Sequence, residues 1–109
     1  MATTYKVLGQ VAPSATTATT LYTVPSATSA VVSTISVCNQ AGTAATYRIA
    51  VRPAGAALAA EHYIVYGATV PASDSTMITV GLTLATTDVV TVYASSANLS
   101  FNAYGSEIA

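Results

Sequence analysis

Short segments in which apolar and polar residues alternate recur along the chain, and this pattern constrains the fold more than any other feature. In the segment 46–52 (TYRIAVR), Tyr47, Ile49 and Val51 share one face. The other face carries both arginines of the chain, Arg48 and Arg52. Successive side chains of a strand point to opposite faces, so this period of two predicts a half-buried antiparallel strand with both arginines on the solvent face.

Seven further segments have strand-like composition or alternation. The stronger ones are 31–39, 62–70, 76–82, 88–95 and 99–105, and the weaker ones are 5–10 and 21–24. Turn-forming residues separate all of them. About eight strands at short, regular spacing predict one all-β domain over residues 1–109, an antiparallel β-sandwich, a jelly roll or a small barrel.

Two of these segments make specific predictions about which side chains are buried. In 31–39 we expect Val31, Ile35 and Val37 on one face, and in 76–82 we expect Ile78, Val80 and Leu82 on one face; these are the alternating apolar positions. The Ala-rich stretch 55–62 (GAALAAEH) is the only helix candidate, and a loop with one helical turn is an equal alternative.

The scarcity of charge excludes several classes of function. Charged residues make up 6% of the chain, against roughly 25% in a typical soluble protein, and Ala, Thr and Ser supply 51 of the 109 positions. Three basic residues cannot form the patch that a phosphate backbone or an anionic membrane surface requires, so we expect neither nucleic acid nor membrane as a partner. A nearly uncharged, hydroxyl-rich exterior suits a subunit that is packed into an assembly.

No motif in the sequence indicates a particular enzymatic reaction. The chain has one cysteine and one histidine, too few for a zinc site, and no G-x-S-x-G or phosphate-binding glycine loop. We expect Cys38 to be a small core residue, and Asp74 and Asp88 to be turn residues. We therefore expect no enzymatic activity, no metal and no cofactor. The start, MATTYKV, lacks the pattern of a signal peptide, so we expect synthesis in a cytoplasm without export by a cleaved signal.

The few ionisable side chains gather in the segment 47–67. Adjacent residues on a strand point to opposite faces, so Glu61 and His62 cannot pair as a catalytic dyad if the strand starts there. We interpret the cluster as the polar part of a docking surface beside the 53–60 loop. The candidate interface residues are Arg48, Arg52, Glu61, His62 and Tyr63.

The sequence resembles a family of phage proteins. The matching features are LYTVP (21–25), VCN (37–39), RPAG (52–55), TDVVTVYAS (87–95) and GSEI (105–108), and the similarity covers nearly the whole chain. In these features the chain is similar to small β-sandwich virion structural proteins of tailed bacteriophages, especially cyanophages. Such proteins occur as decoration (cement) proteins of the head and as tail-associated components.

The resemblance implies a function and partners. We expect a capsid decoration protein that binds the outer surface of the assembled head and stabilises it, located in the virion after assembly in the host cytoplasm. The implied partners are the major capsid protein or other virion subunits, and further copies of this chain in a homo-oligomer, with a trimer favoured by the three-fold axes of a capsid. A tail, neck, baseplate or fibre component is the alternative, and a carbohydrate-binding module in host recognition is the second alternative.

Overall fold

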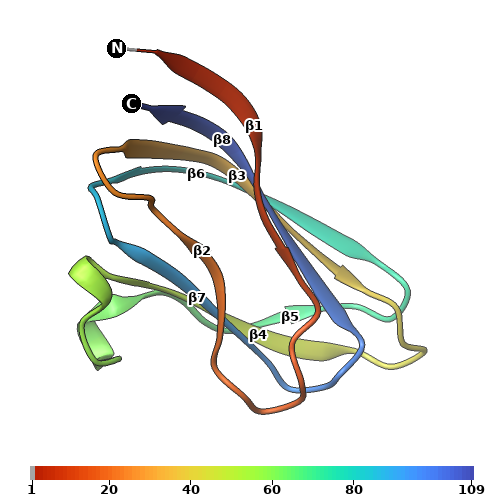
Figure 1. Ribbon diagram of the computed structural model, residues 1–109. Coiled ribbons are helices and arrows are strands. Elements are labelled where there is room, and N and C mark those ends of the chain that lie inside the picture. The colour runs from red at the N-terminus through yellow and green to blue at the C-terminus, as the bar shows by residue number, and fades with distance from the viewer. Residues whose placement is uncertain (1) are drawn as a thin grey trace.

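The computed structural model describes residues 2–109, which form eight antiparallel strands in two four-stranded sheets. The strands are β1 (Thr3–Val11), β2 (Thr19–Thr23), β3 (Ser29–Asn39), β4 (Ala45–Arg52), β5 (Tyr63–Val70), β6 (Ser75–Leu84), β7 (Val89–Ala94) and β8 (Leu99–Ile108). The predicted all-β fold is confirmed, and each of the eight segments expected from the sequence overlaps one strand. Figure 1 shows the two sheets as two facing layers, with both termini at one end.

The strand order is that of a jelly roll. One sheet has the order β1-β8-β3-β6 and the other has the order β2-β7-β4-β5. The antiparallel pairs β1–β8, β2–β7, β3–β6 and β4–β5 therefore join the first strand to the last and so on inward along the chain. This arrangement leaves four edge strands, with β1 and β2 on one side of the sandwich and β5 and β6 on the other.

The core lies between the two sheets and is made by the alternating apolar residues. Phe101 of β8 and Tyr47 of β4 are buried and meet edge to face, with ring centroids 6.1 Å apart. Ile49 is also fully buried, and Val51 packs against the core, as the alternation in β4 predicts. Ile78, Val80 and Leu82 of β6 likewise pack against the core. Burying these side chains is the dominant favourable contribution to folding.

A β-bulge makes one sequence prediction wrong. The register of β3 against both neighbours shifts between Val32 and Thr34, so Ser33 is an extra residue. The bulge moves the alternation by one position, because a single unpaired residue reverses which side chains face inward. Val32, and not Val31, is therefore in the core together with Ile35 and Val37. Cys38 is also outside the core, since it is half-buried between Val37 and Asn39.

A buried asparagine holds the loops together at one end of the sandwich. Asn39, 1% exposed, donates from its side-chain amide to the carbonyls of Thr43 (2.9 Å), Val70 (3.2 Å) and Pro71 (3.3 Å). Its side-chain oxygen accepts the N–H of Ala41 at 3.0 Å. One buried side chain therefore satisfies backbone groups of both the β3–β4 and the β5–β6 loops.

Replacing this asparagine tests its structural role. Asn39→Ala leaves three carbonyls and one N–H without their partner, and unsatisfied buried polar groups are costly. We expect the free energy of unfolding to fall by about 2–4 kcal/mol in urea titrations. The matched control is Asn98→Ala, where the side chain is exposed and the change should stay within about 0.5 kcal/mol. Equal effects of the two substitutions would refute this role.

Candidate docking surface

The predicted site residues lie on or beside the outer face of the sheet β2-β7-β4-β5. Arg48 and Arg52 are four residues apart on β4, so they point to the same face, as the alternation predicts. The chain then leaves the sheet as the 53–62 segment, which contains two short 3-10 turns, η1 (Pro53–Gly55) and η2 (Ala60–His62), before β5 begins at Tyr63. Figure 1 shows this segment projecting from one end of the sheet. The loop with helical turns, one of the two alternatives, is what the structure contains.

Arg48 is held between two aromatic rings. Its guanidinium carbon lies 4.2 Å from the ring centroid of Tyr66 and 4.2 Å from that of Tyr93. Both tyrosines are the direct cross-strand neighbours of Arg48, Tyr66 on β5 and Tyr93 on β7. The ring of Tyr63 packs edge to face on Tyr66, with centroids 4.9 Å apart. Cation–π contacts fix the plane of the guanidinium and leave its N–H groups in the plane free to donate.

Strand β5 is irregular at two positions, and one of them brings Tyr63 and Tyr66 together. Gly67 is unpaired between Tyr66 and Ala68 and has a φ of +79°, the left-handed conformation that glycine adopts without strain. A second irregularity lies at Ile64, between the paired residues Tyr63 and Val65. Because of this irregularity, Tyr63 and Tyr66, three positions apart, can touch on one face.

Arg52 has a different role from Arg48. Its Nε donates to the Thr91 hydroxyl at 3.0 Å, and its Nη1 donates to the carbonyls of Gly55 (3.3 Å) and Ala56 (3.0 Å). Asp88 assists by accepting the N–H of Ala54 at 2.9 Å, in agreement with the turn chemistry expected of it. Both side chains fix η1 against the sheet, so Arg52 is only partly exposed and its Nε and Nη1 groups donate within the chain.

Glu61 and His62 do not lie at the start of a strand. The prediction that strand alternation points their side chains to opposite faces is therefore wrong. Both lie in η2, where the N–H of His62 donates to the Ala59 carbonyl at 3.1 Å. The N–H of Ala59 in turn donates to Nδ1 of His62 at 3.1 Å. Nδ1 is therefore the acceptor in this contact. Glu61 is exposed, and no hydrogen bond joins its carboxylate to His62.

A polar network that sequence reasoning missed lies on the opposite side of the sandwich. The Tyr22 hydroxyl of β2 donates to Glu107 of β8 at 2.5 Å, and Lys6 of β1 forms an ion pair with the same carboxylate at 2.9 Å. The hydrogen bonds from Tyr22 and Lys6 lower the pKa of Glu107 below its usual value. Burial, and then the adjacent carboxylate, raise the pKa of Tyr22. The network joins the two sheets where β1 and β2 lie at their edges.

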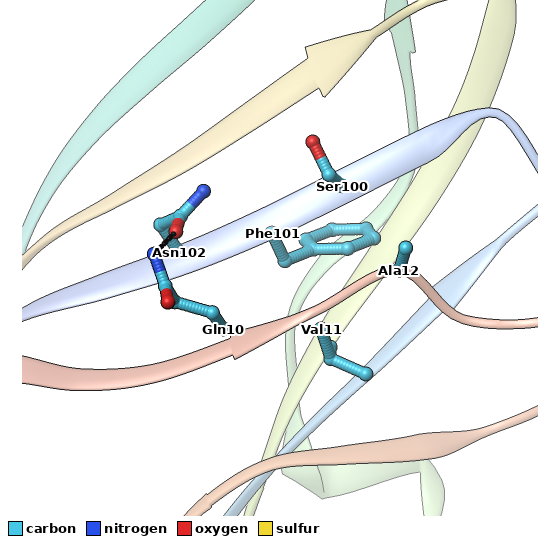
Figure 2. A pocket seen from close by; sticks show the side chains of 6 residues that line it. All are labelled: Gln10, Val11, Ala12, Ser100, Phe101 and Asn102. Carbon is cyan, nitrogen blue, oxygen red and sulfur yellow. Dashed lines mark hydrogen bonds between the residues drawn. The ribbon is translucent and has the colours of Figure 1, made fainter.

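Two open recesses lie on the other sheet. The first, of about 360 Å³, is lined by Gln10, Val11, Ala12, Ser100, Phe101 and Asn102. Figure 2 shows the hydrogen bond that the side-chain amide of Gln10 donates to Asn102, whose length is 2.7 Å. The second, of about 530 Å³, is lined by Tyr5, Lys6, Val7, Val31, Ser33, Tyr104, Gly105 and Ser106. Neither recess gathers a nucleophile with a histidine, since His62 lines neither of them.

Among residues 2–109, no three His, Cys, Asp or Glu side chains lie together as a metal-binding group. No helix within the same residues has the length and apolarity needed to cross a membrane.

Comparison of the chain with protein-family models and with curated proteins found no match. The structure thus brings Arg48 and Tyr63 into one cluster with Tyr66 and Tyr93, and it places Arg52 and His62 in the architecture of the 53–62 segment.

The two arginines are predicted to differ in their contribution to stability. Arg52→Gln removes charged donors from three acceptors, and we expect a loss of about 1–2 kcal/mol in the free energy of unfolding. Arg48→Gln removes only cation–π contacts, for which we expect about 0.5–1 kcal/mol. Urea unfolding of both variants measures the difference. A larger loss from Arg48→Gln than from Arg52→Gln would contradict the assignment.

The Glu107 network predicts how stability depends on pH. The folded-state pKa of Glu107 is lowered, so its contribution is present above the usual carboxyl pKa of 4.5 and is lost as the pH falls through the folded-state value. The folded-state pKa of Tyr22 is raised above 10.0, so its contribution is lost as the pH rises past 10.0. Tyr22→Phe should weaken both trends. Thermal unfolding of wild type and variant from pH 3 to pH 11 provides the check, and parallel curves would count against the network.

Proposed function

We propose that this chain is a non-enzymatic structural subunit of a phage virion, and that it decorates the outer surface of the assembled head and stabilises it. The observation that carries the proposal is the uncharged side of the sandwich formed by β5 and β6. Neither Tyr63–Val70 nor Ser75–Leu84 contains a charged residue or a proline, although both are edge strands. Monomeric proteins protect such edges with charges, prolines or bulges, and these two strands have bulges but neither charge nor proline. Uncharged edges of this kind fit a chain that acts inside an assembly.

The fold and the surface agree with this function. Jelly rolls are common in viral capsid and lectin domains. Several large apolar side chains are exposed, among them Tyr5 at 83%, Met77 at 70% and Tyr66 at 65%. Tyrosine and methionine are enriched at protein interfaces relative to the rest of the surface. The proposed partners are the major capsid protein or other virion subunits and further copies of the chain, with a trimer favoured.

The energy of such binding would come from repetition. A chain of 109 residues can bury only a modest area against a capsid subunit. Several copies joined in a symmetric oligomer would engage several capsid sites at once, and each further contact is then an intramolecular step. A weak individual contact is therefore compatible with stable decoration.

The alternatives within virion proteins share this chemistry and differ in location. A tail, neck, baseplate or fibre component would use the same uncharged edges. A carbohydrate-binding role in host recognition is the second candidate function, and the hydrogen-bonded side-chain amides of Gln10 and Asn102 at one open recess favour it. Side-chain amides can both donate hydrogen bonds to sugar hydroxyls and accept them.

Reconstitution tests the proposal. Purified chain added to heads that lack it should bind at a fixed ratio and raise the temperature at which the heads lose their contents, because a ligand of the intact state stabilises that state. Bovine serum albumin at equal concentration serves as the control. Labelling of intact virions with antibodies separates head from tail. Absence of binding to heads, or binding without added heat resistance, would refute decoration, and specific hits on a glycan array would favour the second candidate.

A further inference from the structure

Five of the seven charged side chains make a hydrogen bond or an ion pair within the chain. Lys6 pairs with Glu107, and Arg52 donates to Thr91 and to two loop carbonyls. Asp74 accepts the N–H of Ser75 at 2.8 Å, and Asp88 accepts the N–H groups of Ala54 and Ala85. Within residues 2–109, Arg48 and Glu61 are the two charged side chains left without a hydrogen bond or an ion pair. One is a cation and the other is an anion.

Both lie beside the edge strand β5. Arg48 lies on β4 opposite Tyr66 of β5, and Glu61 lies two residues before β5 begins. The stretch between them along β5 exposes Ile64 at 44% and Tyr66 at 65%. Leu58, 38% exposed, lies in the loop just before η2. An apolar centre with a charge toward each end is the usual composition of a protein interface.

The charges beside β5 indicate what kind of partner would bind there. Arg48 and Glu61 of one copy do not form an ion pair with each other. A second copy presents the same two charges, so a contact between Arg48 of one copy and Glu61 of another would be repeated by a two-fold axis or in a closed ring. A nucleic acid or an anionic membrane would need several cations here, whereas Arg48 is alone between two tyrosines.

We propose that β5 and the 56–62 loop form a self-association surface in which Arg48 of one copy binds Glu61 of another. The inference rests on the self-association part of the proposed function and not on the location of the protein in the particle. The two tyrosine rings, each 4.2 Å from the guanidinium carbon, orient the group before it binds. A guanidinium held in this way can donate two parallel N–H bonds to one carboxylate.

Charge reversal tests this contact. Sedimentation equilibrium is measured for wild type, Glu61→Arg, Arg48→Glu, the double exchange Arg48→Glu with Glu61→Arg, and an equimolar mixture of the two single variants. We expect wild type to associate reversibly, and each single reversal to raise the dissociation constant by about tenfold or more. The double exchange should restore association, because it recreates the pair with opposite signs.

Two controls separate this contact from general effects of charge and folding. Asp74→Arg changes the net charge as much as Glu61→Arg does but lies beyond the other end of β5, so it should leave the dissociation constant unchanged. Glu61→Arg leaves the tyrosine stack in place, so it reports on association even if Arg48→Glu lowers stability. Thermal unfolding of each variant confirms that it is folded.

Three results would overturn the inference. These are a wild type that stays monomeric up to millimolar concentration, equal weakening by Asp74→Arg and Glu61→Arg, and a folded double exchange that does not associate. The head-binding experiment decides the proposed function separately. A monomer that binds heads would refute the self-association surface alone, whereas an associating chain that ignores heads would refute decoration alone.

Discussion

The contact between Phe101 and Tyr47 joins the two sheets at their centres, and the rest of the structure depends on this apolar interface. Phe101 lies on β8, between β1 and β3, and Tyr47 lies on β4, between β5 and β7. Both side chains are buried, so the inner faces of all these strands must be apolar where they surround the pair. Because only 6% of the residues are charged, ion pairs cannot replace this burial, and the polar contacts act instead at the ends and edges of the sandwich.

The sequence was sufficient to predict the strands, because a period of two is a direct consequence of burying one face of each strand. It was not sufficient for Val31 and Val32, since both are apolar and only the bulge at Ser33 decides which one faces the core. The strand order was equally out of reach, because the pairing of β1 with β8 joins opposite ends of the chain. Arg48 was identifiable as a surface residue, but its two tyrosine partners come from β5 and β7, and no spacing along the sequence could reveal that stack.

Some of the few polar side chains stabilise the fold, and others remain available to bind a partner. Asn39 ties two loops, Arg52 and Asp88 fix η1, and Glu107 joins β1 to β2 through Lys6 and Tyr22. Clustering of ionisable residues in 47–67 is thus in part a structural requirement of the 53–62 segment. Arg48 and Glu61 are the charged members of the cluster that make no hydrogen bond or ion pair within the fold, so a partner could bind their charged groups without breaking one.

The uncharged edges raise the question of why such a chain would form a closed assembly and not a fibre. The backbone offers an answer, since each of the two edges contains a glycine with positive φ, Gly67 in β5 (+79°) and Gly81 in β6 (+60°). Both lie where the register of the strand shifts, and such bulges twist an edge and interrupt its row of free backbone groups. Each edge is therefore divided into short straight pieces. A short piece can pair with one neighbour in one register, particularly where a charge pair fixes that register, but it cannot template a long continuous sheet.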